Sequence, residues 1–312
     1  MPVKVASEWL NSCSGCEIAI LNLGETLLEL LPQLDFVHIP VLMDHKYLGQ
    51  LGDQAHMEIP EAKVGLLSGG IRNEEHLEVA LEMRKKCDIL IALGTCATHG
   101  GIPALINSFT NESLMERYYN TESTDPKGAE GAASQGCSPL LERCYALDEK
   151  IDVDIYLPGC PPHPDQIGAA ILALLNDEPL ELPFKSVCDT CPTIRKGKGD
   201  IKDIKRFIES PEFDPEKPVD EMRCLLEQGY LCMGPVTRAG CAGTHNGVPR
   251  CISARVPCRG CYGPVRQEGN QLLDMLNALA SNGIDVKNLP DRANLLRFSG
   301  AHNRLVAKKE RK

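Results

Sequence analysis

Apolar and polar positions follow two alternating patterns along the first half of the chain. Five short apolar runs predict strands, at residues 3–6, 36–42, 64–70, 88–93 and 153–157. Three stretches with helical spacing predict helices, at residues 17–31, 73–86 and 165–176. Strand, helix and strand therefore alternate, which predicts a doubly wound, flavodoxin-like α/β domain over residues 1–182.

The second half of the chain lacks such a pattern. Six cysteines and six glycines lie between Cys224 and Cys261, with prolines among them. Glycine frees the backbone and proline restricts it, so little regular structure is expected there. Because this segment has no apolar face to bury, we expect a thiophilic metal or metal–sulfur cluster to order it. Residues 183–312 are thus predicted to form a small irregular domain, with amphipathic helices near 265–281 and 290–298.

Composition narrows the class of protein. A net charge of −10 over 312 residues argues against nucleic acid or an anionic membrane as the main partner. The chain shows no export signal and no apolar run long enough to cross a bilayer. We therefore expect a cytoplasmic protein that is rich in metal ligands and whose fifteen cysteines do not form disulfides.

Twelve of the cysteines fall into three sets of four. The first set is Cys13, Cys16, Cys96 and Cys160; the second is Cys188, Cys191, Cys224 and Cys232; the third is Cys241, Cys251, Cys258 and Cys261. Members of the first set all follow predicted strands closely. Parallel strands end at one edge of their sheet, so we expect these four thiols to meet there.

Four thiolates suit either Zn²⁺ or a [4Fe–4S] cluster. Proline follows Cys160 and Cys191, as in ferredoxin sequences, and the first set lies where α/β sheets bind cofactors. Both features favour iron–sulfur. A non-redox zinc scaffold remains the alternative.

Other residues near the three sets receive structural interpretations. Cys87, Cys137 and Cys144 are predicted to be small buried residues, the last two on either side of a helical turn, with a regulatory thiol as the alternative. The histidines His99, His163 and His245 are predicted to be hydrogen-bond donors behind the ligands or surface residues. We expect Glu17 to favour a helix N-terminus, and a proton relay is its alternative role.

Three polar segments are predicted to lie on the surface. Residues 121–136 are small and polar and predict a loop with some mobility. Residues 193–220 carry a run of lysines that we interpret as a solvated face, with docking to an acidic partner as the alternative. A basic tail at 308–312 ends the chain.

Short motifs around these cysteines resemble those of the small, electron-transferring subunit of [NiFe] hydrogenases. The segments 13–16 (CSGC), 94–96 (GTC) and 158–161 (PGCP) are similar to that family's proximal-cluster motif. Segments 232–241 and 257–261 are similar to its distal and medial motifs. The resemblance covers nearly the whole chain, and it implies that the first, third and second sets hold the proximal, medial and distal clusters.

This sequence departs from many family members at two positions. Cys188 stands where histidine is frequent, and Cys251 stands where proline leaves a three-iron medial cluster. We therefore predict three [4Fe–4S] clusters, an arrangement suited to a low-potential acceptor.

Within that family, the chain resembles the G-type subunit of the cytoplasmic methanogen hydrogenases that reduce methyl viologen and not coenzyme F420. The resemblance implies a catalytic nickel–iron large subunit, a [2Fe–2S] subunit and heterodisulfide reductase as partners, with H₂ split on the large subunit. Electrons would pass from the first set to the third, then to the second. The alternatives are the small subunit of the F420-reducing enzyme or of another cytoplasmic [NiFe] hydrogenase. A respiratory-complex subunit is disfavoured by residues 183–312.

Overall fold

The computed structural model describes residues 2–40, 42–43, 46–49, 51–119, 136–197, 203–205, 211–243, 247–289 and 291–307. The predicted loop at 121–136, apart from Gly136, lies outside the described residues, as do His245, the basic tail and part of the lysine run. All fifteen cysteines are described, and none of them is in a disulfide.

A parallel sheet organises the first half of the chain. Within the described residues it has five strands: β1 (Val3–Trp9), β2 (Leu34–His38), β3 (Ala62–Ser68), β5 (Cys87–Leu93) and β7 (Ile155–Leu157). Their order across the sheet is β2-β1-β3-β5-β7, and every neighbouring pair is parallel. This is the flavodoxin order, so the predicted fold class is confirmed.

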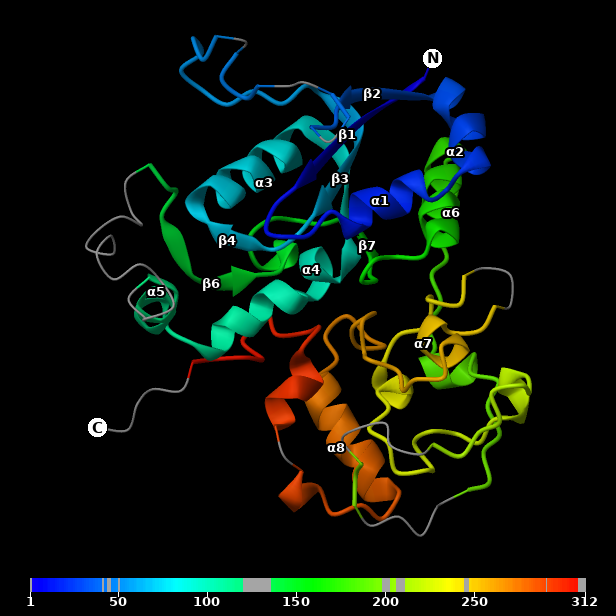
Figure 1. Cartoon of the computed structure of the whole chain (residues 1–312). Helices are drawn as coiled ribbons and strands as arrows, with labels where there is room; N and C mark the ends of the chain where they lie inside the picture. The colour runs from blue at the N-terminus through cyan, green and yellow to red at the C-terminus, as the bar shows by residue number, and fades with distance from the viewer. Residues whose placement is uncertain are drawn as a thin grey trace.

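Helices cover both faces of the sheet (Figure 1). Helices α1 (Gly15–Leu21) and α6 (Pro164–Leu175) pack on one face, where Ile20 and Ile167 are buried against strand residues. Helix α3 (Glu74–Lys86) covers the other face and buries Met83. The Asn73 side chain accepts a hydrogen bond from the backbone N–H of His76 at 2.8 Å and so caps the N-terminus of α3.

Two predictions for the first half were wrong. The helix expected over 17–31 is broken into α1 and α2 (Glu25–Leu30), because Gly24 has a φ of 59° and turns the chain. The region after β5 contains α4 (Gly94–His99), α5 (Asn111–Tyr119) and β6 (Leu140–Tyr145). Strand β6 pairs antiparallel with the short β4 (Ile71–Asn73), so Cys144 lies in a strand and not beside a helical turn.

The second half is irregular, as predicted. Helix α8 (Gln271–Ser281) packs Met275 and Leu279 into a core that includes Cys232 and Cys258. The helix α7 (Arg250–Ser253) is short, and the helix expected over 290–298 is a single 3₁₀ segment. The described 3₁₀ helices are Leu31–Gln33, Ile102–Ser108, Leu147–Glu149, Val187–Asp189, Val219–Glu221, Gly234–Val236, Val286–Asn288 and Arg292–Leu296.

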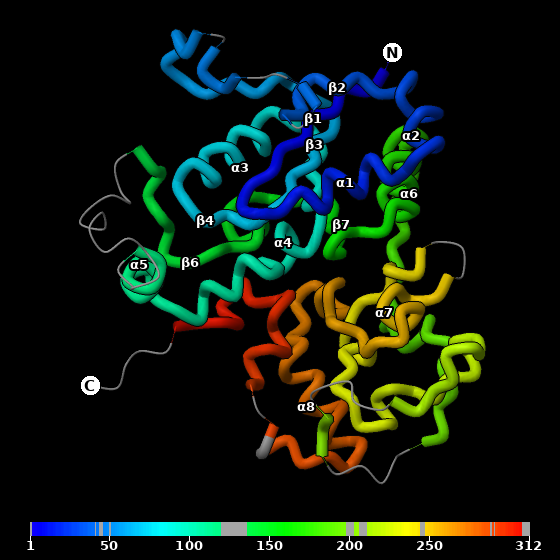
Figure 2. Tube along the Cα trace, viewed as in Figure 1, coloured from blue at the N-terminus to red at the C-terminus, as the bar shows by residue number. Residues whose placement is uncertain are grey.

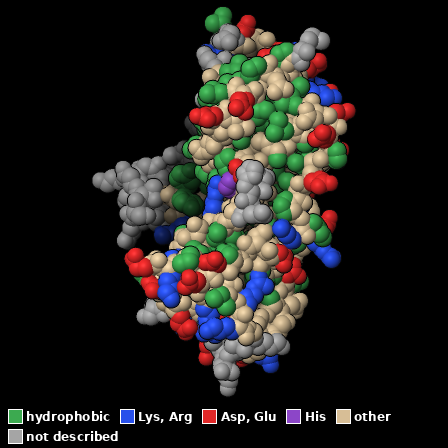
Figure 3. Space-filling view, turned by 90° about the vertical axis from the view of Figure 1, so that its right-hand side faces the viewer, with side chains coloured by type: hydrophobic (Ala, Val, Ile, Leu, Met, Phe, Trp, Pro, Cys, Tyr) green, Lys and Arg blue, Asp and Glu red, His purple; other side chains and the backbone are tan. Residues whose placement is uncertain are grey.

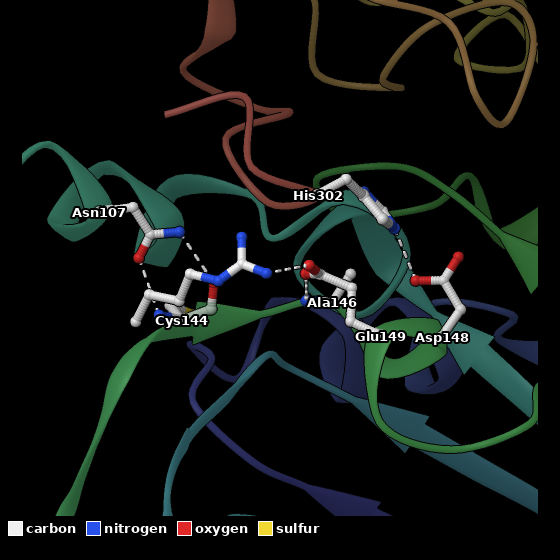
Figure 4. Close-up of polar contacts among 7 residues, drawn as sticks. Asn107, Cys144, Ala146, Asp148, Glu149 and His302 are labelled. Carbon is white, nitrogen blue, oxygen red and sulfur yellow. Dashed lines mark hydrogen bonds and ion pairs between the residues drawn. The ribbon is translucent and has the colours of Figure 1, made fainter. Parts of the chain in front are cut away.

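The last described residues return to the sheet domain, which the red segment shows in Figures 1 and 2. Ser299 forms a parallel bridge with Gly101, and the backbone N–H of Ala301 donates to the carbonyl of His99 at 3.2 Å. The ring of His302 lies 2.7 Å from the carboxylate of Asp148, as Figure 4 shows. The two halves of the chain are therefore joined both through the linker after α6 and through this C-terminal segment. In the part of the chain described here, no helix is long and apolar enough to span a membrane.

Candidate functional site

The first set of cysteines meets at the carboxyl edge of the sheet. Cys13 follows β1, Cys16 begins α1, Cys96 lies in α4 just after β5, and Cys160 follows β7. Burial raises the pKa of Cys16 above its usual value, and the neighbouring Glu17 and the three other thiols of the set raise it further. The structure thus brings together four thiols from three separate loops, as the strand order requires.

The second set gathers in the irregular half. Cys188 lies in the 3₁₀ segment Val187–Asp189, close to the loops that carry its three companions. Burial, followed by the neighbouring Cys232, raises the pKa of Cys188 to about 12; Cys191 and Cys224 contribute to this rise, and Arg195 opposes it.

The third set surrounds a cavity. All four of its cysteines, together with Cys160, line a space of about 150 Å³ between the two halves of the chain. This is far more room than one water molecule needs. Burial, followed by the nearby Cys241 and Cys251, raises the pKa of Cys261 to about 12.

The three sets lie in series. Cys160 of the first set touches the third, because its backbone N–H donates to the sulfur of Cys261. The third set also contacts the second, because the backbone N–H of Cys258 donates to the Sγ of Cys232 at 3.3 Å. The third set therefore lies between the first and the second.

The electrostatics of each set disfavour free thiolates. A thiolate loses hydration when it is buried, and a second thiolate nearby adds like-charge repulsion. Backbone N–H groups offset only part of this: those of Gly234 and Cys258 point at Cys232 and lower its pKa. A bound cationic group would offset the remaining free-energy cost of holding the buried sulfurs as thiolates. Within the described residues, no three His, Cys, Asp or Glu side chains are arranged to hold a single metal ion.

Glycines let the backbone approach the sulfurs closely. A Cβ at Gly94, whose φ is 85°, would lie 2.4 Å from the Sγ of Cys16. At Gly101 it would lie 2.6 Å from the Sγ of Cys96, and at Gly234 it would lie 3.0 Å from that of Cys188. The shape around the thiols therefore depends on residues without side chains.

The three remaining cysteines differ from one another. Cys87 is buried in the core beneath α3, as predicted. Cys144 is also buried, and its backbone is bonded in both directions to the side-chain amide of Asn107, at 2.7 and 2.8 Å (Figure 4). Cys137 is exposed, so its predicted burial was wrong.

Histidines and Glu17 have structural partners. His99 is fully buried beside Thr98, at 2.6 Å, and burial lowers its pKa well below the usual value, which keeps the ring neutral. His163 caps α6 by accepting from the backbone N–H of Asp165 at 3.3 Å. Glu17 lies in the first turn of α1, as expected, but is buried and accepts a hydrogen bond from Ser68 at 2.5 Å.

A buried polar network was not foreseen. The carboxylate of Glu8 lies 2.8 Å from the ring nitrogen of His38 and accepts a hydrogen bond from the hydroxyl of Tyr47. The one available signal was a charged residue inside an apolar strand, because such a residue is seldom buried without partners.

Comparisons relate this chain to known proteins. A family model described as NADH ubiquinone oxidoreductase, 20 Kd subunit, matches residues 13–174. The chain is 41% identical to the G-type subunit of the vhu F420-non-reducing hydrogenase of Methanocaldococcus jannaschii, over 95% of this chain and 94% of that one. It is 34% identical to the iron-sulfur, G-type subunit of the F420-non-reducing hydrogenase of Archaeoglobus profundus, over 90% and 88% of the two chains.

A solved structure is also similar. A chain of an NAD⁺-reducing [NiFe]-hydrogenase in the H₂-reduced state superposes with a TM-score of 0.53 and 29% identity. The match covers 63% of this chain and all of the other.

These findings define first a class of protein, the small subunits of hydrogenases. The chain belongs to the NADH ubiquinone oxidoreductase 20 Kd subunit family and, within it, to the G-type subunits of F420-non-reducing hydrogenases. The predicted function, the electron-transferring small subunit of a hydrogenase, is confirmed.

The glycine at position 94 yields a test of the site's shape. Gly94→Ala should lower the free energy of unfolding by about 1–2 kcal/mol for the left-handed backbone, and by about 1–3 kcal/mol more for the overlap with Cys16. Gly283→Ala is the matched control, because its φ of 83° is close to that of Gly94 but no atom lies within 4 Å of the added Cβ. Urea unfolding under anaerobic, reducing conditions measures both, and equal losses would contradict the close contact.

Proposed function

We propose that this chain holds three [4Fe–4S] clusters and conducts electrons between a nickel–iron catalytic subunit and a low-potential acceptor. The proximal cluster is assigned to Cys13, Cys16, Cys96 and Cys160; the medial to Cys241, Cys251, Cys258 and Cys261; the distal to Cys188, Cys191, Cys224 and Cys232. The observation that carries the proposal is the serial arrangement of the three thiol sets. Residues 1–182 and 183–312 are proposed as the two domains.

The thiol sets fit such clusters in their chemistry. Each offers four soft sulfur donors, and thiolates that repel one another in a buried site gain most from a cationic core. The space among the third set and the glycines against the sulfurs leave room for a bound group. When bound, the clusters supply one-electron carriers at potentials that their surroundings adjust.

The chain's own contribution is to place and adjust the carriers. Backbone N–H groups directed at Cys232, Cys258 and Cys261 favour the thiolate form and draw charge from the sulfur. Such hydrogen bonds raise a cluster's potential, whereas burial away from water lowers it. The hydrogen bonds to the sulfurs and the burial of the sulfurs both come from the loops that carry the cysteines.

An apolar surface next to the first set suits the catalytic subunit. Cys13 is exposed, and Trp9, Ile18 and Leu21 on the adjoining strand and helix expose 44%, 52% and 45% of their surface. Large exposed apolar side chains grouped at one place mark interaction sites. We propose that this surface, residues 9–21, docks the large subunit.

Electrons leave from the opposite end in this proposal. Cys188 and Cys191 belong to the C-terminal half of the chain. In Figure 3 the lower part of the molecule shows Lys and Arg side chains mixed with Asp and Glu, whereas the upper part shows more hydrophobic ones. A [2Fe–2S] subunit and then heterodisulfide reductase are proposed as acceptors there. The free thiols need a reducing compartment, which supports a cytoplasmic location.

Two alternatives differ in measurable ways. A zinc scaffold would be colourless and would contain no acid-labile sulfide. The F420-reducing enzyme would carry its electrons to a deazaflavin, so assay with that acceptor distinguishes it from the proposal.

The docking surface can be tested with one charge. Ile18→Glu should reduce the amount of large subunit that co-purifies by more than tenfold, because burying an unpaired carboxylate costs several kcal/mol, and about 1.4 kcal/mol is a factor of ten. Leu81→Glu is the control, since Leu81 is 51% exposed on α3, over the other face of the sheet. Undiminished co-purification of the Ile18→Glu variant would refute the assignment.

The four-iron medial cluster can be tested by removing its fourth ligand. Cys251→Pro should leave three thiolates and give a three-iron EPR signal in the oxidised protein. Position 251 lies in the first turn of α7, where proline is tolerated. Cys87→Ala, which removes a buried thiol of the core, should give the wild-type spectrum. An unchanged spectrum in Cys251→Pro would contradict the medial assignment.

A further inference from the structure

The first and third thiol sets come from different halves of the chain, and the gap between them is closed at one junction. Figure 1 shows α4 at the lower edge of the sheet domain, facing the C-terminal half. Cys160 and Cys261 meet there. Their separation therefore depends on the contacts that join three loops to one another. These are the loop after β5, the loop after β7 and the loop that carries the third set.

Thr95 makes those bonds. It lies between Gly94 and Cys96 and is 1% exposed. Its hydroxyl accepts from the backbone N–H of Gly159 at 2.9 Å and donates to the carbonyl of Cys261 at 2.5 Å. Its own N–H donates to the carbonyl of Gly159 at 2.8 Å. One hydroxyl thus joins two of the three loops of the first set, those after β5 and β7, to a residue of the third set.

The described contacts at the other junction come from main-chain donors. Between the third and second sets, the N–H of Met233 donates to the carbonyl of Cys258 at 2.9 Å, and the N–H of Cys258 donates to the Sγ of Cys232. These are main-chain donors that no substitution other than proline removes. Across the first junction the N–H of Cys160 likewise donates to the sulfur of Cys261, and the Tyr262 hydroxyl accepts from the N–H of His163. Thr95 adds side-chain bonds to this main-chain contact.

We propose that Thr95 is a positioning residue that sets the separation between the proximal and medial clusters through its hydroxyl. The proposal rests on the cluster assignment above. A buried hydroxyl with both hydrogen bonds made holds its partners in one geometry, and its loss leaves the Gly159 N–H and the Cys261 carbonyl unpaired. The loops of the first set could then move relative to that of the third.

The test compares two substitutions at this position. Thr95→Val keeps the shape and removes the hydroxyl, whereas Thr95→Ser keeps the hydroxyl. In the fully reduced protein, low-temperature EPR should show that Thr95→Val loses or changes the magnetic interaction between the proximal and medial clusters. The medial–distal interaction should stay as in the wild type, and Thr95→Ser should restore the wild-type spectrum.

A second measurement does not depend on bound iron. Amide hydrogen exchange at Gly159 should accelerate in Thr95→Val and not in Thr95→Ser. Thr98→Val is the matched control, because Thr98 is equally buried in α4 but its hydroxyl bonds only to the neighbouring His99 among the described contacts. It should leave both readouts unchanged.

The outcomes separate this proposal from the proposed function. If wild-type protein lacks clusters, the cluster assignment fails, and with it the claim that Thr95 spaces them; the exchange data then decide whether the hydroxyl joins the loops. If clusters are present and Thr95→Val retains both the wild-type interaction and the exchange protection of Gly159, the positioning role is overturned. Equal effects in Thr95→Val and Thr98→Val would also overturn it.

Discussion

The mutual repulsion of buried thiolates is the constraint on which the rest of this structure depends. Twelve sulfurs lie in three groups, and within each group burial and neighbouring sulfurs raise the pKa of the thiols. Such groups are stable either as neutral thiols or around a cationic core. The C-terminal half has few alternative sources of order, since its apolar core is small and includes the thiols of Cys232 and Cys258. The folding of this half is therefore expected to be coupled to the binding of the cationic group.

The order of the strands determines where the first thiol set lies. In a parallel sheet of this order, the loops after β1, β5 and β7 lie at one edge, although they are separated by some 150 residues of sequence. The same edge faces the C-terminal half, so the first set has the third as its neighbour. The exposed apolar residues beside Cys13 lie on the first strand and helix. The first set is therefore open to a partner on one side and enclosed by the C-terminal half on the other.

Spacing and apolar runs predicted the sheet, α3 and the three groups of thiols, because each depends on short-range patterns. The break at Gly24 was missed, since an apolar stripe continues on both sides of it and only the backbone angle shows the turn. The pairing of β4 with β6 joins short strands that are distant in sequence, and no local pattern specifies it. Thr95 and Glu8 could not be assigned either, because their partners are backbone groups or residues that only the tertiary fold brings near.

The central claim, that this chain exists to hold three cubane clusters in series, is tested most directly by metal analysis of protein purified without oxygen. The account predicts about twelve iron atoms and as many acid-labile sulfides per chain. A preparation of intact, folded protein with markedly less iron, or with zinc and no sulfide, would contradict it.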